Sequence, residues 1–213
     1  AALYLGPESR ALTHLLLTLG PQYDMASYDP KTQAVCTETG KTNRLLMRRY
    51  ATIQKARDAS VVGLVVGTLG IHAYLPLLKE LRRILTSRGS RRKVYTISVG
   101  KLNPTKLANF LEIDVFVLVA CPENSLLDTR DFMRPVVTPW EMMLAVQARG
   151  DQEVPWTGAY VLDFANVMHD ASHMDTETAQ DGEDDEQPHY SFATGTYVTR
   201  TKYGSFSSGN ETD

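Results

Sequence analysis

The sequence predicts an α/β protein in which a parallel sheet is flanked by helices, in the manner of Rossmann-like and flavodoxin-like folds. Continuous apolar and β-branched runs such as Val61–Val66 are typical of strands that are buried on both faces of a parallel sheet. These runs alternate with amphipathic helical segments, which is the pattern of β-α-β connections. With 213 residues, 43% of them hydrophobic, the chain is long enough to bury such a core.

Residues 1–41 are expected to end one α/β domain and to connect it to the next. Leu3–Leu5 is interpreted as a short strand, Pro7-Glu8-Ser9 is predicted to open a helix that reaches about Leu19, and Tyr23–Tyr28 is a second candidate strand. The polar stretch Lys31–Lys41 is interpreted as a connector. Because the chain opens on a strand without an initiator Met, we expect residues to be missing upstream, with a processed N-terminus as the alternative.

A second α/β domain is predicted over residues 42–203, and it opens with a long helix. Thr42 or Asn43 is the expected cap, and the helix should reach about Ala59. The face opposite its apolar positions is predicted to be basic, with Arg44, Arg48, Arg49, Lys55 and Arg57. A solvated face is the favoured interpretation, and contact with an acidic partner is the alternative.

The other elements of this domain follow from apolar runs and from capping signals. Asn103 precedes Pro104 as cap and first helical residue, and Thr138 with Glu141 forms a capping box. The predicted elements are a strand at Val61–Val66, a helix at Ala73–Arg88, a strand at Lys93–Val99, a short helix from Asn103, a strand at Asp114–Ala120 and a helix from Thr138 to about Val146. Aromatic, strand-like pieces at Trp156–Phe164 and Tyr190–Tyr197 are expected to return to the domain.

Charge is distributed unevenly along the chain. Eight acidic residues and no Lys or Arg lie in residues 170–187, so the net charge of −3 becomes +5 without them. A solvated acidic loop is the favoured interpretation, with docking of a basic partner as the alternative. Residues 204–213 are rich in Ser and Gly and are expected to be a disordered tail.

Several classes of protein are excluded at this point. The apolar runs are far shorter than the roughly 20 residues that cross a bilayer, and no signal peptide opens the chain. Two cysteines, Cys36 and Cys121, cannot build a disulfide scaffold, so reduced thiols in a cytoplasmic protein are expected. Neither a membrane nor a nucleic acid is an expected partner.

Three segments are predicted to meet at the carboxyl edge of the sheet, where open parallel sheets bind their ligands. They are Gly67–Gly70, Gly100-Lys101 and Cys121–Ser125. Cys121 can be a small buried residue, a nucleophile served by His72, or a ligand of a metal or cluster. An iron–sulfur cluster takes three or four thiolates, so this chain alone cannot complete one.

The remaining candidates favour ordinary structural roles. Gly67–Gly70 matches neither GxGxxG nor a Walker A loop, so a tight turn is favoured over an anion site. His169 and His173 are spaced for one helical face, yet exposed histidines are favoured over metal ligands. Trp140 and Trp156 are expected to be packing anchors.

Several longer motifs, in matching order, resemble the diphthamide synthesis family. The resemblance covers roughly Leu3–Val146, with a fainter match at Phe192–Tyr197. The matching motifs are Arg48-Arg49-Tyr50 with Ile53–Ala59, Val62–Gly70, Val99–Pro104 with Lys106–Phe110, Ile113–Ser125 and Arg134–Pro139.

The resemblance implies three similar α/β domains that each give one cysteine to a shared [4Fe–4S] cluster. Residues 1–41 then end the second domain, and residues 42–203 form the third. Cys121 falls on the cluster cysteine of the third domain. Cys36 lies where the family pattern places no ligand and is expected to be an ordinary thiol.

The resemblance also implies an activity, the first step of diphthamide formation. In this step a 3-amino-3-carboxypropyl group passes from S-adenosylmethionine to a histidine of translation elongation factor 2. The chain is similar to the second subunit of a eukaryotic heterodimer, which would support or reduce the cluster of the first subunit with the help of a small electron-donor protein. A non-redox scaffold subunit is the alternative, and a small-molecule enzyme using Gly67–Gly70 and His72 is a third interpretation.

Overall fold

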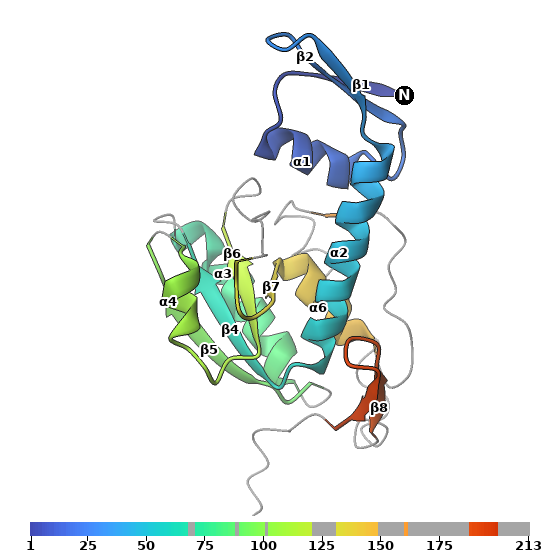
Figure 1. The fold of residues 1–213 in the computed structure, drawn as a ribbon. Helices are drawn as coiled ribbons and strands as arrows, with labels where there is room; N and C mark the ends of the chain where they lie inside the picture. The colour runs from blue at the N-terminus through green and yellow to red at the C-terminus, as the bar shows by residue number, and fades with distance from the viewer. Residues whose placement is uncertain are drawn as a thin grey trace, which may run out of the picture.

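The computed structural model describes residues 1–67, 71–87, 90–100, 102–120, 131–148, 160–161 and 188–199, with the backbone alone at 71–74. Its described part consists of a small N-terminal unit and a larger α/β unit. The long helix α2 (Thr39–Asp58) runs from the small unit along the side of the larger one (Figure 1).

The N-terminal unit is a three-stranded sheet with one covering helix. Strands β1 (Ala2–Leu5) and β2 (Met25–Asp29) are parallel, and β3 (Ala34–Thr37) pairs antiparallel with β2. Helix α1 (Arg10–Thr18) starts at Ser9, whose hydroxyl accepts a hydrogen bond from the amide of Leu12 as expected for an N-cap. The strands and the helix predicted in this region are therefore confirmed.

The prediction that Lys31–Lys41 is only a connector is wrong. This stretch contains strand β3 and the first residues of α2. The turn before β3 is held by Asp29, whose carboxylate accepts hydrogen bonds from the Lys31 amide and from the Thr32 hydroxyl. Such a turn folds β3, whose four residues are all exposed, back on β2, where backbone pairing holds a strand that buries none of its side chains.

The predicted cap of α2 is also corrected. The helix begins at Thr39 with Glu38 as its N-cap residue, and Thr42 lies inside it, donating its hydroxyl to the Glu38 carbonyl at 3.0 Å. The carboxylate of Glu38 accepts from the Ser27 hydroxyl at 2.6 Å instead of capping the helix. Its negative charge at the helix N-terminus is still favourable for the helix dipole.

The larger unit is built on a fully parallel four-stranded sheet. Its strand order is β5 (Lys93–Ser98), β4 (Val61–Val66), β6 (Val115–Val119) and β7 (Val136–Val137). The first three strands match the predicted ones. Strand β7 was not predicted, because a two-residue strand carries too little pattern to be recognised.

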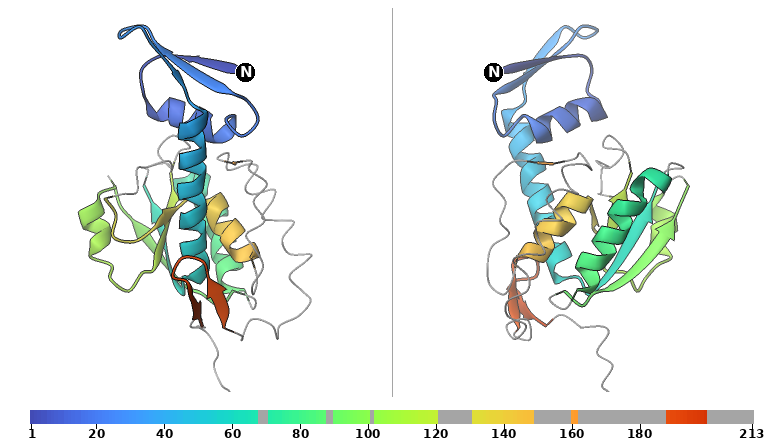
Figure 2. Two further views of the ribbon diagram at one scale, coloured as in Figure 1. Left: turned by 45° about the vertical axis from the view of Figure 1, so that its right-hand side comes forward. Right: turned by 180° about the vertical axis from the view of Figure 1, so that it is seen from behind.

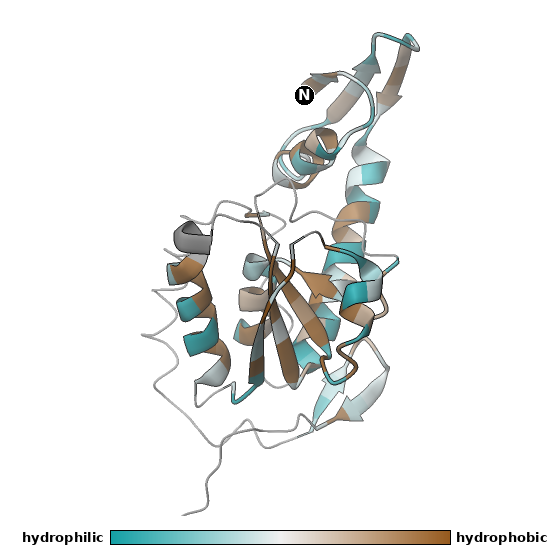
Figure 3. Cartoon of the chain, turned by 90° about the vertical axis from the view of Figure 1, so that its left-hand side faces the viewer, coloured by the Kyte–Doolittle hydropathy of each residue, from teal (hydrophilic) through white to brown (hydrophobic). Residues whose placement is uncertain are grey.

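Helices cover both faces of this sheet (Figure 2). On one face Val62, Leu64 and Val66 pack with residues of α2, α3 (Ile71–Thr86) and α6 (Pro139–Gln147). On the other face Val61 and Val65 pack near the short helix α4 (Pro104–Ala108). All six residues of β4 are buried, as the continuous apolar run predicted, and the central strands of this sheet are brown over most of their length in Figure 3.

A hairpin from the C-terminal part of the chain is fastened to the end of α2. Strands β8 (His189–Ser191) and β9 (Thr196–Val198) pair antiparallel. The carboxylate of Asp58 is 2.8 Å from the Nε2 of His189 and accepts from the Ser191 hydroxyl at 2.5 Å. The expected return of Tyr190–Tyr197 to the domain is thus confirmed, whereas most of Trp156–Phe164 lies outside the described residues.

Candidate functional site

The parallel strands bring three predicted loop positions to one edge of the sheet. At their carboxyl ends Val66 is paired with Ser98 of β5 and with Val119 of β6. The amide of Gly67 donates to the carbonyl of Val119 at 3.3 Å, and the amide of Val99 donates to that of Val66 at 3.1 Å. The starts of the three loops are therefore adjacent.

At this edge Gly67 packs against the end of β6 with ordinary spacing. A Cβ built on Gly67 would lie 3.8 Å from the Cβ of Ala120 and 3.6 Å from Leu118 Cδ1, which is ordinary contact. Gly67 and Ala120 thus lie side by side where β4 and β6 end. Cys121 follows Ala120 directly in the chain, so the start of its segment is fixed at this edge.

The chemistry-bearing residues of the three loops lie outside the described residues. These are Thr68–Gly70, Lys101 and Cys121–Ser125, and the side chain of His72 is likewise not described. His169, His173 and Trp156 also fall outside. Among the described residues no group of three metal-binding side chains occurs.

Buried charge lies deeper in the domain, between α2 and α6. The guanidinium of Arg49 donates to both carboxylate oxygens of Glu141, with an Nε–Oε1 distance of 2.5 Å. The Tyr160 hydroxyl donates to the same carboxylate at 2.7 Å, and the carboxylate also accepts from the Thr138 amide at 2.8 Å, which completes the predicted capping box. Trp140 packs on Tyr160 with ring centroids 4.9 Å apart, so its predicted anchoring role is confirmed.

This network corrects the predicted basic face of α2. Arg49 is only 8% exposed and Arg57 only 3% exposed, so neither lies on the outer face of the helix. A partner cannot reach Arg49 without opening the domain. Arg44, Arg48 and Lys55 are exposed and make up the remaining basic positions.

Arg49 and Tyr160 each keep a single protonation state in this network. Burial alone would lower the pKa of Arg49, but the Glu141 carboxylate outweighs it and the pKa is raised, so the guanidinium stays charged. Burial and then the negative charge of Glu141 raise the pKa of Tyr160, so its hydroxyl stays a donor. The network is a structural lock that holds α2 against α6.

The raised pKa of Tyr160 predicts a loss of stability at alkaline pH. The unfolded chain releases the tyrosine proton above about pH 10 while the folded chain retains it, so this contribution is present below pH 10 and falls by about 1.4 kcal/mol per pH unit above it. Urea unfolding between pH 8.5 and 11 should show this slope in the wild type. Tyr160→Phe should flatten it relative to the wild type, and parallel curves for the two proteins would contradict the prediction.

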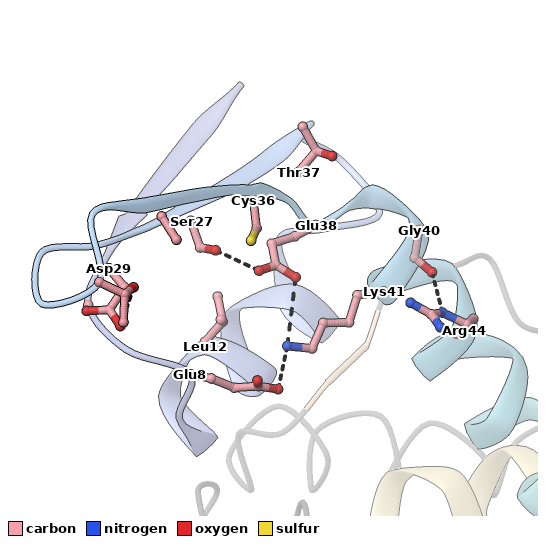
Figure 4. Close-up of a pocket in the computed structure, with 13 residues that line it drawn as sticks. Glu8, Leu12, Ser27, Asp29, Cys36, Thr37, Glu38, Gly40, Lys41 and Arg44 are labelled. Atoms are coloured by element: carbon pink, nitrogen blue, oxygen red, sulfur yellow. Dashed lines mark hydrogen bonds and ion pairs between the residues drawn. The ribbon is translucent and has the colours of Figure 1, made fainter.

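A separate cavity of about 390 Å³ lies in the N-terminal unit (Figure 4). It is lined by α1, β2, β3 and the start of α2, and the exposed thiol of Cys36 borders it. Its charges compensate one another, since Lys41 pairs with Glu8 at 2.6 Å and approaches Glu38 at 3.9 Å. The hydrogen bond from Lys41 lowers the pKa of Glu8. Nothing in this cavity gives Cys36 a role beyond the predicted ordinary thiol.

The fold defines the chain as an α/β protein with a parallel sheet flanked by helices, a class whose members commonly bind ligands at the carboxyl edge of the sheet. The family model for diphthamide synthesis proteins matches residues 1–161. The chain therefore belongs to the diphthamide synthesis family. No described helix is both long and apolar enough to span a membrane.

Relatives from fungi and vertebrates show a more specific similarity within this family. The chain is 40% identical over 205 residues to 2-(3-amino-3-carboxypropyl)histidine synthase subunit 2 of Schizosaccharomyces pombe, covering 93% of this chain and 39% of that protein. It is 47% identical over 177 residues to the subunit of that name from Gallus gallus, covering 83% of this chain and 36% of that protein. The chain thus spans well under half the length of these relatives.

A solved structure agrees with these matches. Dph2 from Pyrococcus horikoshii, solved with a 4Fe-4S cluster, has a TM-score of 0.54 and 27% identity with the chain, covering 71% of this chain and 42% of that one.

Proposed function

We propose that the chain is the cluster-bearing C-terminal part of subunit 2 of 2-(3-amino-3-carboxypropyl)histidine synthase and that Cys121 is one ligand of a [4Fe–4S] cluster. The observation that carries the proposal is the position of Ala120 at the carboxyl edge of the sheet, beside Gly67. A cysteine that directly follows such a strand end can serve as a cluster ligand, because thiolates are the ligands of iron–sulfur clusters.

The donor set fits a shared site rather than a complete one. This chain supplies one thiolate, so the other cluster ligands come from parts of the protein outside this chain. The cluster, when bound, supplies an electron-transfer centre. The strand that precedes Cys121 in the chain is firmly held, since β6 is buried on both faces and paired on both sides.

The remaining expectations belong to the complete complex. The partner of this chain in the complex is the first subunit of the synthase. The substrates of the complex are S-adenosylmethionine and a histidine of translation elongation factor 2. A small electron-donor protein serves the cluster in the cytoplasm. In this arrangement subunit 2 supports or reduces the cluster of the first subunit. By resemblance to the family, we propose that residues 1–41 end the second of three similar domains and that residues 42–203 form the third.

Iron content tests the proposal directly. The complete subunit is purified anaerobically with its sister subunit as wild type, Cys121→Ala and Cys36→Ala, and iron and sulfide are counted per heterodimer. Cys121→Ala should lose about one cluster of iron and sulfide, because removing the thiolate leaves one iron of the cluster without its protein ligand. Cys36→Ala is the matched control and should keep the wild-type content.

An unchanged iron content in Cys121→Ala would demote this residue to a core thiol. A non-redox scaffold subunit would then be the better description of the chain. Heterodimer formation by size-exclusion chromatography must remain intact in each variant, so that lost iron is not confused with lost assembly.

A further inference from the structure

The exposed face of α2 carries unneutralised positive charge. Arg44, Arg48 and Lys55, here called the basic stripe, are spaced by four and seven residues and so lie on one side of the helix. In the part of the chain that the structure describes, none of the three forms an ion pair. Arg44 donates only to the Gly40 carbonyl.

The helix itself offers no counter-charge to the basic stripe. Its single acidic residue is Asp58, and that carboxylate is engaged by His189 and Ser191 of the β8–β9 hairpin. Like charges spaced by one turn repel one another and destabilise a helix. An acidic occupant would therefore be favourable along this face.

The chain contains an occupant of matching charge. Residues 170–187 carry eight acidic side chains and no Lys or Arg. Residues 162–187 lie outside the part of the chain that the structure describes, so only their sequence and covalent connection count here. The segment ends at Gln187, two residues before His189.

The anchoring of His189 limits how far this segment can move away. Glu186 is three residues before His189, and an extended chain spans at most about 3.6 Å per residue, so the two Cα atoms are within roughly 11 Å. Lys55 is only one helical turn before Asp58, the residue that holds His189. The acidic residues closest to the hairpin are therefore within reach of the basic stripe.

The chain before the segment is also anchored beside this helix, at Tyr160, ten residues before Asp170. Tyr160 binds Glu141, which in turn pairs with Arg49 in the middle of α2. The chain therefore departs from and returns to α2, at its middle and at its C-terminal end. The anchor at His189 and the charge complementarity favour this helix over other surfaces.

We propose that the basic stripe of α2 is a docking surface whose occupant is the acidic segment 170–187 of the same chain. Recognition is by carboxylate pairing with Arg48 and Lys55 and, at the far end, with Arg44. Such pairs are exposed and are screened by salt. This inference does not depend on the cluster or on the enzymatic activity proposed above.

Carbodiimide coupling of the full chain tests the docking, because this reagent joins a lysine amine only to a carboxylate in contact with it. Mass spectrometry should find Lys55 coupled to carboxylates of residues 170–187. The yield should fall at least about threefold between 0.01 and 1 M salt, where the Debye length shrinks from about 30 to 3 Å. The pair Lys41–Glu8 is the internal standard for coupling.

A pair of variants provides the second measurement. Glutamyl endopeptidase cleaves at Glu177, Glu183 and Glu186, and its rate should rise about threefold in Arg48→Glu/Lys55→Glu. The control Lys31→Glu/Lys79→Glu carries the same charge change on the β2–β3 turn and on α3 and should cleave like wild type.

Three results would overturn the inference. One is coupling of Lys41 to Glu8 without coupling of Lys55 to the segment. Another is equal cleavage of the two double variants. The third is Lys55 coupling that occurs only between isotopically distinct copies of the chain, which would make a second copy the occupant.

Discussion

Glu141→Gln is expected to lower the free energy of unfolding by about 3 to 5 kcal/mol, the usual cost of breaking one side of a buried ion pair. The carboxylate of Glu141 has no solvent exposure and accepts hydrogen bonds from Arg49, Tyr160 and the Thr138 amide. Its neutral replacement leaves the charge of Arg49 uncompensated. The measurement is the midpoint and slope of urea unfolding at pH 7.

The size of this effect rests on the charge state of Arg49. Its raised pKa keeps the guanidinium protonated at every accessible pH, so the residue cannot escape by losing its proton. A cost below about 1 kcal/mol would mean that water or another carboxylate compensates the guanidinium, and the lock between α2 and α6 would then be weaker than the contacts suggest.

Two controls separate the charge effect from packing. Glu80→Gln removes a carboxylate from the partly exposed pair with Arg83 on α3 and should cost less than about 1 kcal/mol. Arg49→Met/Glu141→Leu removes both charges and should be markedly more stable than Glu141→Gln alone, because no unpaired charge remains buried. If the double variant is as unstable as Glu141→Gln, the loss of stability comes from packing and not from an unpaired charge.

The main features of the α/β unit could be predicted from local patterns. The strand at Val61–Val66 and the capping box at Thr138 depend on neighbouring residues, and both are confirmed. Strand β3 could not be predicted because its residues Ala34–Thr37 are all exposed and show no alternation. Its formation depends on pairing with β2, which no local pattern encodes.

The misassignment of Arg49 has a similar origin. A basic residue is usually at the surface, and the partner that pays for its burial is 92 positions away in the chain. One signal was present: Leu45, Arg49 and Ile53 are spaced by four residues, so Arg49 continues the apolar stripe of the helix. An arginine on such a stripe predicts a buried acidic partner.

The candidate site was predictable as a place but not as a set of contacts. Parallel strands must end at one edge, so the convergence of Gly67, Gly100 and Ala120 follows from topology. The assignment of Cys121 as a ligand came from the family resemblance and stays a prediction.

Gly63→Ala is expected to lower the free energy of unfolding by about 1 to 3 kcal/mol, because it overpacks the core. Gly63 lies in the middle of β4. At such a position a residue larger than glycine usually stabilises a strand. Here a Cβ would lie 2.9 Å from both Ile113 Cδ1 and Phe116 Cδ1, and both of these side chains are 1% exposed. Neither can move outward without opening the face that α4 covers.

The contact with Ile113 can be isolated by a double-mutant cycle. Ile113→Val removes the Cδ1 atom and alone should cost about 0.5 to 1.5 kcal/mol. In the Gly63→Ala background it should cost less or restore stability, since it clears one of the two close contacts. Gly40→Ala in α2, where nothing lies within 4 Å of the added Cβ, should instead stabilise by about 0.5 to 1 kcal/mol. Additive costs at Gly63 and Ile113 would contradict the overpacking explanation, because the loss at Gly63 would then not arise from contact with Ile113.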